Sequence, residues 1–194
     1  MIHKVLSDAR FFEILQQFDE DIAAEVKARR CPVCGERLDR ANYPRKPRGE
    51  LVTLGPGYDQ RLSFCCCREG CRKRMTPPSV RFLGRKVYLG AVVVLASAML
   101  HGVNSWRLSK LQKLLGVSLR TLKRWRRWWA DVFGPSCFFK TGKAVFGEAV
   151  QVGSLPLSLL EFFGWPDNAQ ETLAKVLKLL RPITSPPHLH ATFF

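Results

Sequence analysis

The chain has 194 residues, of which 46% are hydrophobic and 24% are charged. These values are ordinary for a globular protein and exclude wholesale disorder, and the length suits one medium domain or two small ones. The net charge of +15 and an isoelectric point near 10.0 predict an anionic partner.

The positive charge is concentrated in the middle of the sequence. Residues 1–30 carry a net charge of −1, residues 31–140 carry +16 and residues 141–194 carry zero. Charge that served only solubility would be spread along the whole chain. A basic block between two near-neutral ends therefore predicts binding to nucleic acid, the commonest polyanionic partner.

No segment of the sequence predicts secretion or a membrane span. The first thirty residues lack the apolar stretch of a signal peptide. The longest apolar run, Val87 to Leu100, has fourteen residues, whereas crossing a bilayer takes about 20, so we interpret it as a buried core helix. The expected location is cytoplasmic and nucleoid-associated, a reducing compartment in which clustered cysteines suggest metal before disulfide.

An amphipathic helix is predicted over residues 7–28, within an N-terminal segment of residues 1–30. Ser7 is the expected N-cap, with Asp8 in the first turn. Apolar residues at spacings of three and four form one stripe: Phe11, Leu15, Phe18, Ile22 and Val26. This stripe is expected to pack on the rest of the chain, and a contact in a homodimer is the alternative.

Residues 31–83 are dominated by Gly, Pro, Cys and basic residues. Short strands are expected near Arg37–Tyr43 and Gln60–Cys66, joined by a connection rich in Pro and Gly. A segment of this composition has too little apolar material to form a core unaided. Something besides hydrophobic burial must hold it together.

The cysteines of this segment predict a structural zinc ribbon. Cys31-Pro-Val-Cys34-Gly directs two thiolates from one tight turn, and a cysteine pair on a facing turn would complete a tetrahedron of sulfurs that selects one Zn²⁺ ion. Cys71 is one member of the second pair. Its mate is Cys66, Cys67 or Cys65, and we favour Cys66.

Residues 84–134 are predicted to form a helix-turn-helix domain. The expected helices lie near Lys86–His101, Trp106–Leu115 and Ser118–Ala130, with Gly116 at the sharp turn and Ser118 as an N-cap. The last helix is apolar on one side and basic on the other. A helix of this kind can bury its aromatic residues in a three-helix core and place its charges in a major groove.

Residues 135–194 are expected to be less regular. A glycine-rich loop is predicted over residues 136–153, followed by short helices near Leu155–Phe163 and Asn168–Leu180. Cys137 lies far from the other cysteines and is interpreted as a small core residue. The predicted fold class is therefore mainly α with a small β zinc ribbon: an N-terminal helix, the ribbon, a three-helix core and short C-terminal helices.

The two motifs together resemble the DNA-binding portion of bacterial insertion-sequence transposases and their accessory proteins, in which a zinc ribbon precedes a helix-turn-helix. The matching parts are Cys31-Pro-Val-Cys34-Gly, Cys66 to Cys71 with Arg72-Lys73-Arg74, and Gly116-Val117-Ser118 leading into Thr121 to Trp125. The resemblance covers roughly residues 30–130. The nuclease domain that normally follows in that family does not fit in the residues after Ala130.

We therefore expect a sequence-specific double-stranded-DNA-binding protein without catalytic residues, in a transposition or regulatory role. A homodimer and a transposase are further candidate partners. The expected DNA contacts are Arg120, Thr121, Lys123, Arg124, Arg127, Arg72, Lys73, Arg74, Arg85 and Lys86, with Arg81 as an added phosphate contact. The alternatives are a truncated transposase or nuclease remnant and an RNA-binding or interaction zinc-ribbon protein.

Overall fold

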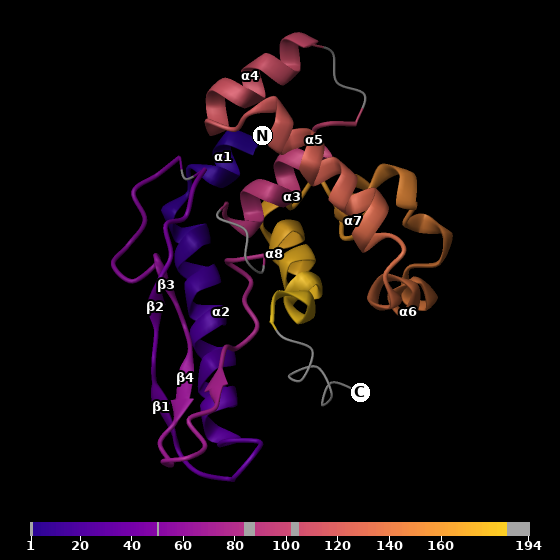
Figure 1. Ribbon diagram of the computed structural model, residues 1–194. Coiled ribbons are helices and arrows are strands. Elements are labelled where there is room, and N and C mark those ends of the chain that lie inside the picture. The colour runs from indigo at the N-terminus through magenta and orange to yellow at the C-terminus, as the bar shows by residue number, and fades with distance from the viewer. Residues whose placement is uncertain (1, 50, 84–87, 102–104, 186–194) are drawn as a thin grey trace. The chain divides into compact units, whose positions relative to one another are not determined.

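The computed structural model describes residues 2–49, 51–83, 88–101 and 105–185 (Figure 1). The chain is mainly helical with a small antiparallel sheet, which confirms the predicted class in outline. It divides into two compact units, each assembled from non-adjacent segments. Unit 1 comprises Met1–Ser7, Gly49–Leu51 and Ala91–Val176, and unit 2 comprises Asp8–Arg48, Val52–Gly90 and Leu177–Phe194. The four segments expected from the sequence are a different division and stay a prediction.

The long helix of unit 2 is α2, Ala9–Ala28. The predicted cap is wrong by one residue, because the Asp8 carboxylate accepts the backbone N–H of Arg10, while the Ser7 hydroxyl bonds His3 instead. The carboxylate also suits the positive end of the helix dipole. The predicted apolar stripe is buried or half-buried throughout, which confirms the inward face of this helix.

Short strands of unit 2 lie along α2 (Figure 1). β1 (Leu38–Arg40), β4 (Phe64–Cys66) and β5 (Arg74–Met75) form an antiparallel sheet in the order β1-β4-β5, and β2 (Tyr43–Pro44) pairs with β3 (Gln60–Arg61). Leu38 lies opposite Cys66, and Phe64 opposite Met75. The small core between sheet and helix consists of Ala23, Cys31, Leu38, Phe64, Cys66 and Met75. Two of its six members are cysteines, so the apolar content is as low as the sequence suggests.

Unit 1 contains three of the predicted helices. α3 (Gly90–Ala98) is shorter than expected and buried on every side, as a core helix should be. α4 (Ser105–Leu115) and α5 (Leu119–Arg127) follow, and a π-helix, η1 (Trp128–Phe133), continues α5. Among the described residues, no helix has the length and hydropathy needed to cross a bilayer. Unit 1 also includes α1, Ile2–Leu6.

The loop predicted over residues 136–153 is wrong, because α6 occupies Cys137–Phe146. The Ser136 hydroxyl accepts the N–H of Phe139 and caps the helix, and Phe139 and Phe146 supply its buried face. Cys137 is exposed rather than in the core. The remaining helices are the short η2 (Gly147–Ala149), η3 (Val152–Ser154) and η4 (Arg181–Thr184), and α7 (Leu157–Phe162) and α8 (Ala169–Leu180), which match the two predicted C-terminal helices.

A buried ion pair joins α2 to the segment after the sheet. Asp19 Oδ2 accepts Arg81 Nε at 2.8 Å, and both side chains are almost wholly shielded from solvent. Asp19 also accepts the Ser79 hydroxyl and the N–H of Val80. The other guanidinium nitrogens of Arg81 donate to the backbone carbonyls of Tyr58 and Gln60. The sequence analysis predicted that Arg81 contacts a phosphate. That prediction is wrong, because the guanidinium of Arg81 is buried and its nitrogens form hydrogen bonds within the protein.

Replacing Asp19 should destabilise unit 2 severely. In Asp19→Asn the guanidinium of Arg81 stays buried without its counter-charge, and breaking one side of a buried pair costs about 3–5 kcal/mol. We expect a drop of that size in the free energy of unfolding measured by urea denaturation. The exposed Asp21→Asn is the matched control and should change it by less than about 0.5 kcal/mol. Equal effects of the two substitutions would contradict the assigned role of the pair.

Candidate metal centre and basic helix

Two tight turns of unit 2 bring four cysteines together. The first turn follows α2 and carries Cys31 and Cys34, with Gly35 just after it at φ +75°. The second carries Cys71 directly after Gly70 at φ +80°, while Cys66 lies at the end of β4. Both glycines adopt the left-handed conformation, which residues with a side chain rarely adopt. Because glycine has no Cβ, it permits each turn.

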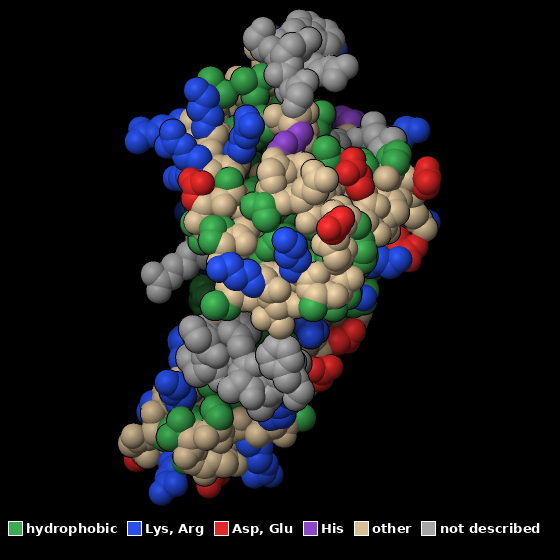
Figure 2. All heavy atoms as spheres, turned by 90° about the vertical axis from the view of Figure 1, so that its right-hand side faces the viewer, with side chains coloured by type: hydrophobic (Ala, Val, Ile, Leu, Met, Phe, Trp, Pro, Cys, Tyr) green, Lys and Arg blue, Asp and Glu red, His purple; other side chains and the backbone are tan. Residues whose placement is uncertain are grey.

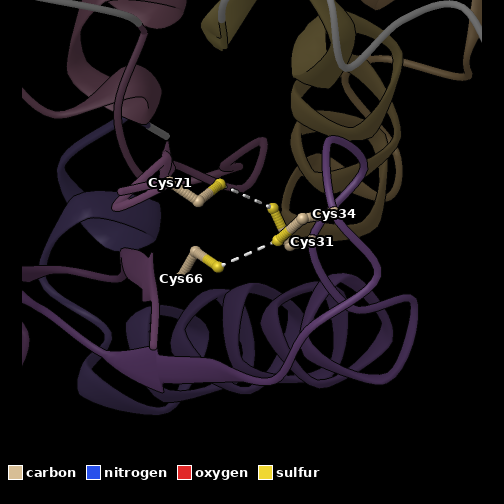
Figure 3. A group of neighbouring side chains, drawn as sticks. All are labelled: Cys31, Cys34, Cys66 and Cys71. Atoms are coloured by element: carbon tan, nitrogen blue, oxygen red, sulfur yellow. Dashed lines mark hydrogen bonds between the residues drawn. The ribbon is translucent and has the colours of Figure 1, made fainter. Parts of the chain in front are cut away.

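The four sulfur atoms lie within 4.8 Å of one another (Figure 3). Cys31 Sγ is 3.7 Å from Cys71 Sγ, and Cys34 Sγ is 3.4 Å from Cys66 Sγ. A cluster of this kind could hold a metal ion. The favoured choice of Cys66 among three neighbours agrees with this cluster.

Strand alternation explains why Cys66 and not its neighbours joins the cluster. Successive side chains of a strand point to opposite faces, and Cys66 shares the buried face with Phe64. Cys65 points the other way, and its Sγ donates to the carbonyl oxygen of Arg72 at 3.4 Å. Cys67 is half-buried and is outside the cluster as well.

Backbone N–H groups already favour the ionised form of some of these thiols. The N–H of Val33, followed by that of Cys34, lowers the pKa of Cys31 to about 7 despite its burial. Burial raises the pKa of Cys66 to about 12, against the opposing hydrogen bond from the N–H of Arg68. The N–H of Lys73 acts to lower the pKa of Cys71, but burial and the thiols of Cys34 and Cys31 raise it overall. Hydrogen bonds to sulfur in this pattern suit thiolates that coordinate a cation.

Metal affinity should therefore fall as the pH is lowered. With a pKa of about 12, Cys66 is protonated at neutral pH in the metal-free protein, and binding must expel that proton. Each such thiol weakens binding by up to about tenfold for every pH unit of acidification. The pKa of Cys31, about 7, adds a further loss only below that pH. Competition with a chromophoric chelator at pH 6, 7 and 8 measures this, and an affinity independent of pH would contradict thiolate ligation.

Serine substitutions separate the cluster from its neighbours. Cys66→Ser removes a ligand from the only cluster of its kind among the described residues, so it should abolish stable metal binding and loosen the sheet. Cys67→Ser, one residue away, should retain both. Metal content after dialysis and circular dichroism report the two properties. Equal metal loss in both variants would place the third ligand elsewhere.

The second candidate feature is α5 in unit 1. The Ser118 hydroxyl accepts the N–H of Thr121 and also bonds its hydroxyl, which confirms the predicted N-cap. Leu122, Trp125 and Trp129 are buried, as predicted for the inward face. At about 100° per residue, the opposite side carries Arg120, Lys123, Arg124 and Arg127, all exposed.

The basic side chains of α5 are available for contacts. Within the part of the chain that the structure describes, no carboxylate forms an ion pair with them. Figure 2 shows one face of the molecule, on which Lys and Arg side chains gather in a dense group at the upper left, at the level of α4 and α5 in Figure 1. Trp128 is half-buried and packs on Trp129 and Phe133, at ring-centroid distances of 4.9 and 5.7 Å.

The other predicted contacts have different surroundings. Arg72 and Lys73 are exposed beside the cysteine turns. Arg74 donates to the carbonyl of Ala41 and to Ser63 Oγ, and its guanidinium lies over the ring of Tyr43, so it has a structural role. The backbone N–H and the hydroxyl of Thr121 both bond the hydroxyl of Ser118, the N-cap of α5. Arg85 and Lys86 lie outside the described residues.

Arg68 is a basic residue near the cysteine cluster that the sequence analysis did not predict as a contact. An open hollow of about 520 Å³ lies between the two cysteine turns, and its lining includes the exposed Arg68 together with Lys73. Arg68 stands alone in the sequence, four residues before the start of the Arg72–Arg74 run. Its position between Cys67 and Cys71 could have predicted this location, because a turn that supplies a metal ligand also places its other side chains close to the site.

Comparison with known proteins identifies no relative: no protein-family model, no curated protein and no solved structure matches this chain.

Proposed function

We propose that this protein binds double-stranded DNA through α5, and that its four-cysteine cluster holds one structural zinc ion. The observation that carries the proposal is the two-sided character of α5. Its inward side is buried around Trp125, whereas its outward side presents four basic side chains without internal partners among the described residues. Such a helix fits a major groove about 12 Å wide.

The connection between α4 and α5 supports a helix-turn-helix arrangement. Gly116 has φ +60°, a left-handed conformation that allows a sharp turn directly after α4. Val117 is buried in this turn, and Leu111 and Leu115 are buried on α4. These residues and the inward side of α5 supply the apolar contacts that fix a recognition helix while its other side stays free.

Zinc is the ion that best fits the cluster. A tetrahedral zinc ion with Zn–S bonds of about 2.3 Å separates its sulfurs by about 3.8 Å. Two of the six sulfur pairs of this cluster lie 3.7 and 3.4 Å apart, and all six lie within 4.8 Å, a size that suits this ion. Four thiolates complete the coordination of the ion and leave no position for a reacting water. The proposed role is structural, joining two turns that have little apolar support.

The cysteine turns are proposed to add phosphate contacts. Arg68, Arg72 and Lys73 are exposed there and meet no carboxylate in an ion pair of the described residues. Such contacts strengthen binding and make it sensitive to salt without reading the sequence. Binding of duplex RNA by shape is the alternative for this surface.

The wider role that we propose is transposition control or regulation. It rests on the resemblance of the two motifs to the DNA-binding portion of insertion-sequence transposases, which stays a prediction. A homodimer, a transposase partner and the lack of catalytic activity likewise remain proposals.

Substitutions on the outward side of α5 should weaken DNA binding most. We expect Arg124→Ala to lower the affinity for duplex DNA about tenfold at 150 mM salt and to reduce the slope of log affinity against log salt by about one. Lys143→Ala on α6 removes the same charge from an exposed position and should change the affinity by less than about twofold. Fluorescence anisotropy with labelled duplexes measures both.

The same assay contains the outcomes that would contradict the proposal. Equal losses in the two variants would mean that only overall charge matters. Tighter binding to duplex RNA than to duplex DNA of equal length would favour the RNA-binding alternative. Loss of DNA binding on zinc removal, with restoration when zinc is returned, is expected if the cluster supports the fold.

A further inference from the structure

The outward side of α5 has a restricted set of side chains, and this restricts which bases it can read. From Leu119 to Arg127 the helix contains Leu, Arg, Thr, Lys and Trp only. It has no Asn or Gln, the side chains that pair with both N6 and N7 of adenine, and no Asp or Glu to accept from N4 of cytosine. What remains is arginine and lysine, which pair with O6 and N7 of guanine, and apolar groups that touch the thymine methyl; of the two cations only arginine offers a planar fork of donors.

Contacts within the protein reduce further the number of α5 side chains that can reach a base. The Thr121 hydroxyl is 3.0 Å from the capping Ser118 hydroxyl, and Leu122 and Trp125 are buried. The first two turns therefore leave Leu119, Arg120, Lys123 and Arg124 facing outward. Leu119 is a large apolar side chain at the first helical position, yet it is 36% exposed.

The spacing of the two arginines suits neighbouring base pairs. Arg120 and Arg124 are four residues apart, so they lie on the same side of α5 and are separated by about 6 Å along its axis. Base pairs of B-DNA are about 3.4 Å apart, so long side chains at this separation can reach base pairs one or two steps apart. Arg120 lies in the first turn of α5 and Arg124 in the second, and the N-terminal residues of a recognition helix are the ones that meet base edges.

We propose that α5 selects guanines, with Arg120 and Arg124 as the specificity-determining residues and Leu119 contacting a thymine methyl. The inference rests on the proposed DNA binding and adds the class of site: a guanine-containing core with an adjacent thymine. Lys123 and Arg127 contact phosphates. The amide and carboxylate chemistry that would fix adenine or cytosine directly is absent from α5.

The experiment begins with selection of sites from a random duplex pool, using zinc-loaded full-length protein at about 150 mM salt, where phosphate contacts are weakened. The expected result is a motif with two guanines one or two steps apart on one strand. Each guanine is then replaced by 7-deazaguanine, which keeps base pairing and phosphates but lacks the N7 acceptor. Affinity should fall about 5- to 100-fold at those positions and stay unchanged at guanines outside the motif.

Charge-conserving variants assign each guanine to its arginine. Arg120→Lys and Arg124→Lys keep the phosphate attraction but lose the planar fork. Each should relax selection at one guanine while leaving the affinity for unrelated duplexes within about twofold. The matched control is Arg127→Lys, which should leave the motif unchanged.

The outcomes separate this inference from the function on which it rests. A motif made of A·T base pairs only, or full affinity for the 7-deazaguanine sites, overturns guanine selection and leaves DNA binding intact. Salt-sensitive binding without any motif also overturns it. Absence of duplex binding at low salt by the folded, zinc-loaded protein overturns both. The 7-deazaguanine arm uses the unmodified protein, so an unfolded variant cannot obscure the result.

Discussion

The meeting of two cysteine turns is the constraint on which the strand-rich part of unit 2 depends. The sheet consists of strands of two or three residues, and its core has only six buried members, two of which are the cysteines Cys31 and Cys66. Such a core cannot offset the conformational entropy of a long connection rich in Pro and Gly. A cation held by four thiolates would supply the missing free energy and fix the register of both turns at once.

Polar contacts carry the rest of unit 2. Asp19 and Arg81 are separated by 62 residues in sequence, yet their bond ties α2 to the segment after the sheet, and Thr184 accepts the N–H of Ser79 in the same network. A buried network of this kind is costly unless every member is bonded. The interior of unit 1 is instead aromatic and aliphatic. Trp129 packs edge-on against Phe133, and the ring of Phe133 also packs against that of Phe139.

Local signals in the sequence predicted most helices, and non-local contacts account for most errors. Ser118 and Gly116 marked the ends of α5 and α4 because capping and left-handed turns are local properties. α6 was missed because the glycines of residues 136–153, Gly142 among them, suggested a loop. In the structure a side chain there would meet the ring of Phe146 at 2.9 Å, so this glycine serves helix packing. Arg81 looked like a surface cation because its partner lies far away in sequence. The preference for Cys66 over Cys67 could be justified only once the face of β4 covered by α2 was known.

We propose that a metal-supported sheet and a basic helix serve DNA binding in one chain, and that α5 is the surface that meets the duplex. Photo-crosslinking of the zinc-loaded protein to duplex DNA carrying 5-bromouracil, followed by peptide mapping, tests this claim most directly. We expect adducts within Leu119–Arg127 that disappear at high salt, with none in Cys137–Phe146. Adducts confined to other parts of the chain, with Leu119–Arg127 unmodified, would contradict it.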